Sequence, residues 1–397
     1  MALSKPTRDL PCEAASPPAR VSHHKREAVS PTSHTARDLP GKRCRKSKPV
    51  ASPKVLRVGS ICTGMGTCFR SLDVIEAWNE DTVKFDHRWA CEISPACQAV
   101  LQASYPNLVI FKDATKCLED AIGVDVLLAG PPCQQFSYAN RKRKNLADSR
   151  PIVYEAIVDY IVARKPRVFL IENVLGLLSN GAPVVEAALS RFQEAGYRLA
   201  ARKLDSHKVG HVPQRRWRVY FVGVLAESTT EDWAASLWPH PLPIAPLSSI
   251  LDYLPQQAGA LPTAPRAQAK VLRLTAALEE ESVPQEAQQE MVVNCNSIHG
   301  RANCGYTPCL TASRGASGGF WLTAQHRMMT LDEMMRLQGM EPSSTDTSMV
   351  SKCKAGHMIG NAFTQSVITR IMARAIPAAS LTPALVDPYD QLGRAQA

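Results

Sequence analysis

The sequence lacks any long uninterrupted apolar segment. Its longest uncharged apolar runs, in a chain of 397 residues, fall far short of the roughly 20 residues that a membrane-spanning helix needs. The start of the chain also lacks the apolar core of a secretory signal. We therefore expect a soluble protein without a membrane partner.

A paired-cysteine framework is lacking as well. The twelve cysteines include no Cys-x-x-Cys pair and show no regular spacing, which excludes the pattern of disulfide-rich secreted scaffolds. We expect reduced thiols in a reducing compartment. Zinc ligation by Cys295, Cys304, Cys309 and His299 is disfavoured because their spacings fit no common zinc pattern, so no metal site is expected.

The first 54 residues contain almost no large apolar side chains and hold most of the positive charge. They carry 12 Lys+Arg and 4 Asp+Glu, a net charge of +8, whereas the whole chain carries +10. Such a segment cannot bury enough surface to form a core, so we expect a disordered tail. Its basic cluster Lys42–Lys48 suits a nuclear-import signal or a nonspecific contact with phosphates, and it predicts a nuclear protein. The alternatives are a solvated tail without a partner and an organelle transit peptide.

From Val55 onward, short apolar runs alternate with helical patterns, as is typical of α/β proteins. Predicted strands cover 55–61, 87–91, 109–112, 124–129 and 168–171, and predicted helices cover 67–78, 151–164 and 183–195. After the first strand, Gly64 and Gly66 let the backbone pass close to a ligand at a helix N-terminus. Phe69 occupies the position of the third glycine of the dinucleotide pattern. Glu92 ends the second strand, where an acid usually binds ribose hydroxyls.

The apolar run 124–129 breaks at Gly130-Pro131-Pro132, and the next residue is Cys133. The prolines stiffen the backbone, so the thiol is presented at the carboxyl edge of a strand, where open α/β sheets place their active sites. Glu172 follows the strand 168–171 and reaches the same edge. Cys133 is therefore a candidate nucleophile, although most free cysteines are buried apolar residues and this residue alone does not decide between the two interpretations.

The segment Gly130-Pro131-Pro132-Cys133-Gln134-Gln135-Phe136-Ser137 resembles the catalytic loop of the cytosine-5 methyltransferases that use S-adenosylmethionine. Further segments match motifs of that family in the family's order: Thr63-Gly64-Met65-Gly66, Glu92, Asp113, Glu172-Asn173-Val174, Gln214-Arg215-Arg216-Trp217-Arg218 and Gly360-Asn361-Ala362. The resemblance extends from about Val55 to Arg374. It implies a Rossmann-like α/β fold with a mostly parallel sheet, helices on both faces and a small irregular target-recognition domain. The implied divisions are a tail at 1–54, a catalytic domain at 55–224, the recognition domain at 225–325, a return to the catalytic domain at 326–378 and a second tail at 379–397.

The resemblance also implies an enzyme that moves a methyl group from S-adenosylmethionine to carbon 5 of cytosine in duplex DNA. Cys133 would add to carbon 6 of a flipped-out base, and Glu172 would hydrogen-bond ring nitrogen 3. Arg216 and Arg218 would line the base pocket and favour the thiolate. The implied cofactor contacts are Thr63, Gly64, Met65, Gly66, Glu92, Ile93, Asp113, Pro132, Asn361 and Ala362. The implied DNA contacts are Gln134, Ser137, Arg141, Arg150, Arg301 and Arg314.

Two alternatives keep the fold and change the function. Transfer RNA could replace DNA, but the Cys-Phe-Thr insertion of the branch that acts on transfer RNA is absent. A nonenzymatic DNA-binding homologue is suggested by Cys62, which stands where the family usually has a Phe against the adenine, and by the altered segment at Met340. The nucleophile, the carboxylate and the arginine pair are all present, which favours the DNA-modifying enzyme.

Overall fold

Most of the chain after its first 51 residues is described by a computed structural model. The described residues are 52–132, 152–229, 233–252, 261–262, 264–280, 282, 288, 290–295 and 302–394. All of them fall within one compact unit. Residues 1–51 of the predicted tail lie outside the described residues, as does the segment 133–151 that follows the two prolines.

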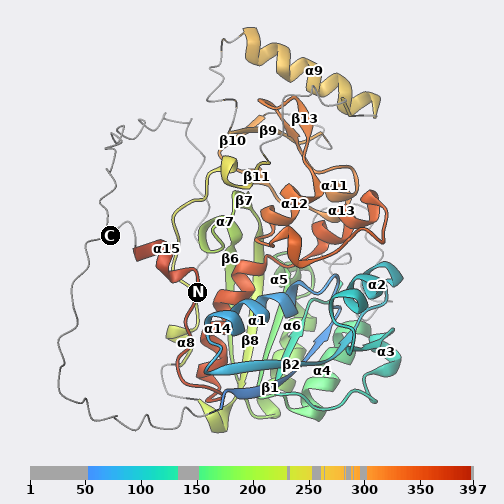
Figure 1. Ribbon diagram of the computed structural model, residues 1–397. Coiled ribbons are helices and arrows are strands. Elements are labelled where there is room, and N and C mark those ends of the chain that lie inside the picture. The colour runs from blue at the N-terminus through green and yellow to red at the C-terminus, as the bar shows by residue number, and fades with distance from the viewer. Residues whose placement is uncertain are drawn as a thin grey trace, which may run out of the picture. The chain divides into compact units, whose positions relative to one another are not determined.

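A seven-stranded sheet forms the centre of this unit (Figure 1). Its strand order is β3-β2-β1-β4-β5-β8-β6. Neighbouring strands from β3 to β5 are parallel, whereas β8 is antiparallel to both β5 and β6. The predicted mostly parallel α/β sheet is therefore confirmed. The strands are β1 (Lys54–Ile61), β2 (Val83–Cys91), β3 (Val109–Phe111), β4 (Val126–Ala129), β5 (Val168–Val174), β6 (Tyr197–Asp205) and β8 (Trp217–Leu225).

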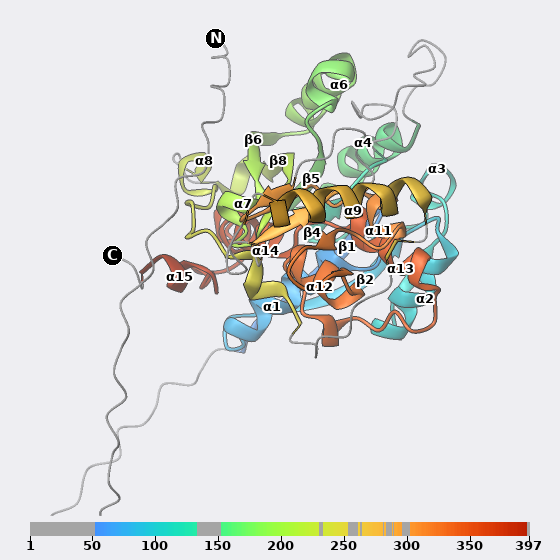
Figure 2. The same ribbon diagram turned by 90° about the horizontal axis from the view of Figure 1, so that it is seen from above.

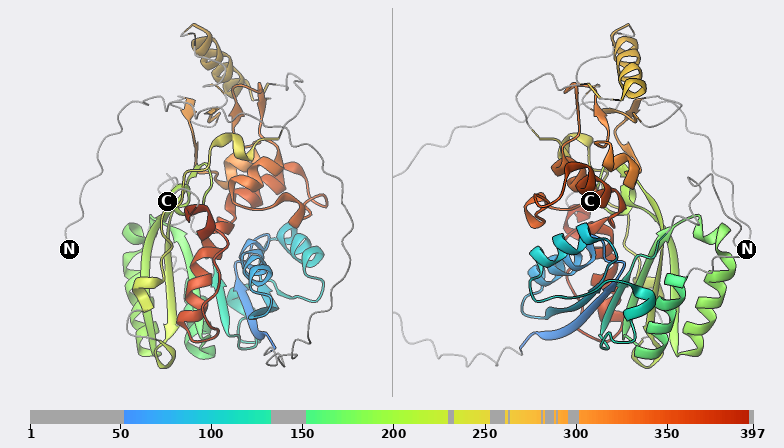
Figure 3. Two further views of the ribbon diagram at one scale, coloured as in Figure 1. Left: turned by 60° about the vertical axis from the view of Figure 1, so that its left-hand side comes forward. Right: turned by 90° about the vertical axis from the view of Figure 1, so that its right-hand side faces the viewer.

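Helices cover both faces of the sheet. On one face lie α1 (Thr67–Trp78) and α14 (Gln365–Ala378), and on the other lie α4 (Ile152–Arg164) and α6 (Ala182–Glu194). Figure 2 shows α4 and α6 on one side of β5 and α1 on the other. Figure 3 shows α14, in red, running along the sheet although it lies near the C-terminal end of the chain. The shorter helical elements around the sheet are α2 (Pro95–Ser104), α3 (Ala114–Cys117), α5 (Leu177–Asn180), α7 (Ser206–Val209), η1 (Ala226–Ser228), α8 (Trp233–Ser236) and α15 (Asp390–Arg394).

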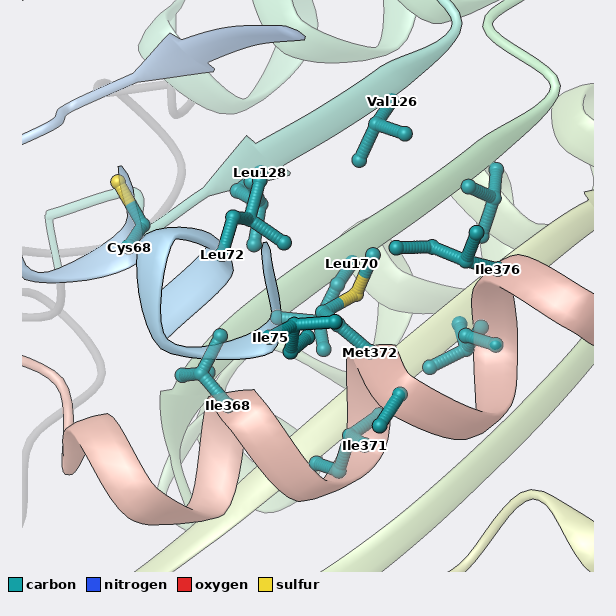
Figure 4. Close-up of a cluster of buried hydrophobic side chains, with 14 of the residues drawn as sticks. Cys68, Leu72, Ile75, Val126, Leu128, Leu170, Ile368, Ile371, Met372 and Ile376 are labelled. Atoms are coloured by element: carbon teal, nitrogen blue, oxygen red, sulfur yellow. The ribbon is translucent and has the colours of Figure 1, made fainter. Parts of the chain in front are cut away.

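The central strands are apolar on both faces, as expected for strands covered on each side. In β4, Val126 and Leu128 belong to the core cluster that contains α1 and α14, whereas Leu127 and Ala129 belong to the cluster that contains α4 and α6. This alternation follows from the period of two along a strand. Figure 4 shows Leu128 beside Leu72 of α1 in the first cluster.

A fully buried arginine anchors α14 to the segment that follows it. Arg370 donates from Nε to Asp387 and from Nη2 to Asp390, each at 2.8 Å. Its Nη1 donates to the carbonyls of Val209 and His240, also at 2.8 Å. A buried guanidinium is tolerated because its donors are satisfied in this way. These bonds tie the C-terminal segment to the sheet-covering helix.

A smaller set of elements follows β8. A four-stranded sheet has the order β10-β9-β12-β13, and β11 pairs in parallel with β7. Within the described ranges, no helix has the length and apolar character needed to cross a membrane. The elements are β7 (Gln214–Arg215), η2 (Leu247–Ile250), α9 (Pro265–Glu280), β9 (Met291–Val293), β10 (Ala302–Cys304), β11 (Thr307–Pro308), α11 (Ala312–Ala316), β12 (Trp321–Leu322), β13 (Arg327–Met328), α12 (Leu331–Leu337), η3 (Pro342–Ser344) and α13 (Lys352–Asn361).

Helices α11 and α13 pack backbone against backbone. A Cβ built on Gly315 would collide with the carbonyl oxygen of Gly356, and one built on Gly356 would collide with that of Gly315. Gly360 approaches the carbonyl of Thr311 equally closely. Any side chain at these positions would push the two helices apart, so the three glycines set their separation.

Candidate active site

The carboxyl ends of β1, β4 and β5 meet at one edge of the sheet because these neighbouring strands are parallel. Gly130 leaves β4 there, and a Cβ built on it would lie 2.7 Å from the ring of Phe363. Glycine is therefore required for this close approach. The carbonyl of Pro131 accepts a hydrogen bond from Asn173 Nδ2 (3.3 Å), which fixes the start of the predicted catalytic loop beside the end of β5. Pro132 is exposed and is the last described residue before the gap. Cys133, Gln134, Ser137, Arg141, Arg150 and Arg301 lie outside the described residues.

The glycine turn after β1 binds the carboxylate that ends β2. Gly64 (φ +61°) and Gly66 (φ +91°) adopt left-handed backbone conformations that favour glycine. Glu92 is buried, and its Oε2 accepts from the Gly64 amide at 2.7 Å while its Oε1 accepts from the Ser94 amide at 2.8 Å. A carboxylate has about four acceptor positions, so two remain for hydroxyl groups of a ligand.

The residues around this turn suit a nucleotide-like cofactor. A Cβ built on Gly64 would meet no atom within 4 Å, so a ligand can approach the backbone closely. The side chain of Ile93 is 74% exposed and offers an apolar surface next to Glu92. Gly66 caps the N-terminus of α1 without a side-chain hydrogen bond. These features suit S-adenosylmethionine, with the carboxylate available to its ribose and the apolar side chain available to its adenine.

Three other predicted cofactor residues have side chains engaged within the protein. Thr63 is buried and donates to the carbonyl of Ser60 at 3.1 Å. Met65 is 1% exposed and packs in an apolar core, so its side chain faces away from the open turn. Asp113 caps α3 by accepting from the Thr115 amide at 3.0 Å, but its carboxylate remains partly exposed. Thr63 and Met65 could therefore contact a ligand only through their main chains.

Glu172 and Arg218 lie on neighbouring antiparallel strands, and their side chains contact each other. Glu172 lies near the end of β5, and Arg218 lies opposite Val174 at the start of β8. The Nε of Arg218 is 3.0 Å from Oε1 of Glu172, and the two side chains are only 12% and 11% exposed. Burial lowers the pKa of Arg218, but the neighbouring Cys309 and Glu172 outweigh it, so the pKa is raised and the guanidinium stays charged. The ion pair holds the carboxylate beside the predicted catalytic loop.

Arg216 is a buried residue beside the same ion pair. It is 2% exposed, and its guanidinium donates to the carbonyls of Leu310 (2.9 Å) and Ala362 (2.7 Å). Burial and the nearby Arg218 both lower its pKa. Arg216, which lies between β7 and β8, therefore ties this part of the chain to the segments before α11 and after α13. The predicted cofactor residue Ala362 is buried in this contact, while Asn361 is exposed at the end of α13.

Cys309 lies beside both arginines, although the sequence suggested it only as one of four disfavoured zinc ligands. Its sulfur lies 3.4 Å from Nη1 of Arg216 and 3.6 Å from Nη2 of Arg218. Burial raises the pKa of the Cys309 thiol, but the two guanidinium groups outweigh burial and hold it below its usual range. No local pattern connects residues that lie 91 and 93 positions apart, so the sequence carried no signal for this contact.

Arg314, a predicted DNA contact, closes the turn into α11. Its Nη1 donates to the carbonyl of Cys309, and the side chain is half-buried. Burial lowers the pKa of Arg314. Across the ranges that the structure describes, no group of three or more His, Cys, Asp or Glu side chains is arranged to hold a metal ion.

The sequence matches a family of known proteins over most of its length. Residues 56–376 match the model of the C-5 cytosine-specific DNA methylases. The type II methyltransferase M.NgoBV of Neisseria gonorrhoeae is 32% identical over 159 residues, which are 38% of this chain and 37% of that protein. M.AgeI of Thalassovita gelatinovora is 40% identical over 136 residues, which are 32% of this chain and 31% of that protein. The chain thus spans about a third of the length of these curated relatives.

Solved structures show the same fold. The crystal structure of the S. pombe Dnmt2 methyltransferase superposes with a TM-score of 0.57 and 16% identity, covering 81% of this chain and 98% of that one. The Entamoeba histolytica methyltransferase EhMeth superposes with a TM-score of 0.57 and 15% identity, covering 82% and 98%. These similarities confirm the predicted Rossmann-like methyltransferase fold.

Proposed function

Since the chain belongs to the C-5 cytosine-specific DNA methylase family, we propose that it transfers a methyl group from S-adenosylmethionine to carbon 5 of cytosine in duplex DNA. One observation carries the proposal. Glu172, held by Arg218 at 3.0 Å, lies next to the residue that binds the carbonyl of Pro131, two positions before Cys133. A carboxylate is thus fixed beside the segment that carries the proposed nucleophile.

Cys133 would make an unreactive carbon reactive. Carbon 5 of cytosine is a poor nucleophile, and addition of a thiolate to carbon 6 builds electron density on it. S-adenosylmethionine would supply the methyl group that carbon 5 accepts. Loss of the proton on carbon 5 and expulsion of Cys133 then restore the double bond and the free enzyme. Gly64, Glu92 and Ile93 would hold the cofactor in the open space beside the glycine turn.

Glu172 would stabilise the ring while the sulfur is attached. Negative charge develops on the base during addition, and a proton shared between Glu172 and ring nitrogen 3 relieves it, with the protonated nitrogen donating to the carboxylate. The ion pair with Arg218 restricts the carboxylate to one position, which lowers the cost of orienting it for the base. Arg216 would support this arrangement indirectly, because its donors bind main-chain carbonyls.

The DNA would have to present a base outside the duplex. Carbon 6 is not accessible to a thiolate inside a stacked helix, and flipping a nucleotide costs about a few kcal/mol. Contacts to phosphate from Arg141, Arg150 and Arg301 would offset this cost. We propose that residues 225–325 read the DNA sequence and that 55–224 and 326–378 form the catalytic part. Arg314 contributes less to DNA binding, because it already donates to the carbonyl of Cys309.

A methyl-transfer assay tests the proposal. Purified protein is incubated with labelled S-adenosylmethionine and either duplex DNA or transfer RNA. We expect label in the DNA, none after Cys133→Ser, and normal incorporation after Cys353→Ser, which replaces an exposed cysteine on α13. Equal incorporation by the Cys133→Ser protein would refute its role as nucleophile.

The same assay separates the alternatives. Label in transfer RNA alone would establish RNA as the substrate. DNA binding without incorporation, together with no binding of S-adenosylmethionine in calorimetry, would establish a nonenzymatic homologue. A duplex containing 5-fluorocytosine tests the nucleophile directly, because it should trap a covalent adduct on Cys133.

The nuclear location predicted from Lys42–Lys48 gains no support from these relatives. The cluster lies outside the described residues, and both curated relatives named above are bacterial proteins. A fluorescent fusion with and without residues 1–54 would decide whether the tail directs the protein to a nucleus.

A further inference from the structure

Glu172, Arg218, Cys309 and Arg216 form a charged cluster at the proposed active site. Arg218 contacts Glu172 through Nε and the sulfur of Cys309 through Nη2. Arg216 contacts the same sulfur through Nη1. The cluster joins β5, β8 and the residue that follows β11, so Cys309 is held by partners distant in the sequence.

The surroundings of Cys309 differ from those of the buried thiols elsewhere in the fold. Burial raises the pKa of Cys68 to about 12 and that of Cys97 to about 11. Cys309 instead faces Arg218 of β8 and Arg216, which lies between β7 and β8.

Two further charged groups lie around this sulfur. The charge of Arg314 on α11 also acts on Cys309, and Glu172 on β5 lies beyond Arg218. Cys309 is half-buried, and a small reagent would approach its sulfur through the exposed part of the residue. A thiol close to guanidinium groups and open to small molecules is the environment in which cysteines react.

We propose that Cys309 is a modification site, a thiolate bound by Arg216 and Arg218 that reacts with hydrogen peroxide and similar small electrophiles. The sulfur lone pair attacks one peroxide oxygen and the O–O bond breaks. The leaving hydroxide takes up a proton to become water. Sulfur is oxidised by two electrons to a sulfenic acid, and the peroxide is reduced. Excess thiol reverses the change through a mixed disulfide.

Modification would disturb the cluster that holds Glu172. A newly formed sulfenic acid is largely neutral. It adds an oxygen on the sulfur that now accepts a hydrogen bond from Arg218 at 3.6 Å. Arg218 would lose one of its two anionic partners and its fixed position. The prediction that methyl transfer then falls rests on the proposed function, whereas the reactivity of the thiol does not.

Alkylation of the full-length protein tests the reactivity without any activity assay. Trypsin releases residues 302–314 as one peptide, which contains Cys309 and the exposed Cys304 as an internal reference. Iodoacetamide rates at both sulfurs are measured by fragment-ion mass spectrometry between pH 6 and pH 9.5. An ordinary thiol, with a pKa of about 8.5, loses 50- to 100-fold in rate between pH 9 and pH 6.5. We expect a several-fold smaller loss at Cys309, with Cys304 measured in parallel in the same peptide. A loss at Cys309 as large as that of an ordinary thiol would overturn the proposal.

Two substitutions test whether Arg218 causes the small pH dependence expected at Cys309. Arg218→Met should shift the profile of Cys309 toward that of an ordinary thiol, whereas Arg215→Met should not, because Arg215 is exposed and stacks on Tyr306 at 4.4 Å. An unchanged profile in Arg218→Met would overturn the role of the arginine. If that variant fails to fold, the wild-type profile still decides the matter.

Peroxide followed by dimedone, which adds to sulfenic acids, tests the oxidation itself. Label should appear at Cys309 and disappear when dithiothreitol precedes the dimedone. Label at Cys304 alone would overturn the assignment.

Discussion

Replacing Gly356 by Ala tests the backbone packing that positions the proposed active site. The added methyl group would collide with the Gly315 carbonyl oxygen, far inside the 3.4 Å at which ordinary contact begins. Its neighbour is main chain, which cannot rotate away as a side chain can. Overpacking usually costs about 1–3 kcal/mol, and we expect the upper end of that range because α11 and α13 must separate as a whole.

The loss should be visible in thermal unfolding and in activity. A cost of about 3 kcal/mol lowers the Tm of a chain of this size by about 4 °C. The carbonyls of Leu310, before α11, and Gly360, in α13, both accept from Arg216, at 2.9 Å and 3.4 Å. Separating the helices pulls these two acceptors apart. Methyl transfer should therefore fall at temperatures where the variant is still folded.

Gly123→Ala is the matched control. The nearest atom to a Cβ at Gly123 is the carbonyl oxygen of Arg164 at 3.9 Å, and its φ lies outside the range that is strained for alanine. This variant should unfold within about 2 °C of wild type or slightly above it. Calorimetry of the three proteins decides the question. A Gly356→Ala protein with the wild-type Tm would show that the helices do not pack at the described separation.

Three further predictions concern charged groups. Glu172→Gln should lower methyl transfer about 10²- to 10⁴-fold while leaving S-adenosylmethionine binding unchanged, and a wild-type rate would contradict the role of the carboxylate. Arg370→Met should cost about 3 kcal/mol in urea unfolding, because the buried Asp387 loses one of its two ion-pair partners and keeps Arg374 as the other; a cost below about 1 kcal/mol would contradict this. The lowered pKa of Cys309 means that the unfolded chain binds one more proton at pH values between the folded and unfolded pKa. The Cys309 thiolate therefore stabilises the folded protein fully above about pH 8.5, and this stabilisation is lost as the pH falls through the folded pKa of Cys309. Cys309→Ser should remove that part of the pH dependence of the unfolding free energy measured in denaturant.

The fold could be predicted because its elements are encoded locally. The apolar run 124–129 contains β4, and the run 168–171 lies within β5. The glycine turn was predicted from Gly64 and Gly66, which do adopt left-handed conformations. The proximity of Glu172 to the predicted catalytic loop followed from the rule that parallel strands end at a common edge.

The finer features of the site depend on contacts that no local pattern encodes. Arg216 binds the carbonyl of Ala362, 146 positions away, so its burial could not be read from the alternation along β8. The same reasoning applies to Cys309, which reaches the arginines only because β11 pairs with β7. Met65 was predicted as a cofactor contact from its motif, but its side chain packs in the core. Motifs identify positions, and tertiary packing decides which atoms of those positions face the ligand.

The placement of α14 has a consequence for how the chain is made. Ile368, Ile371 and Met372 share a core cluster with Leu128 and Leu170, whose strands are translated long before this helix (Figure 4). While the ribosome is still translating the region up to Gln365, α1 can cover its part of that face, but the apolar part that α14 covers is still exposed. A chain that stalls or terminates there exposes an apolar, aggregation-prone surface and is a substrate for chaperones and proteases. Premature stop codons even this late in the gene should therefore remove the protein from the cell instead of leaving a shortened, partly active form.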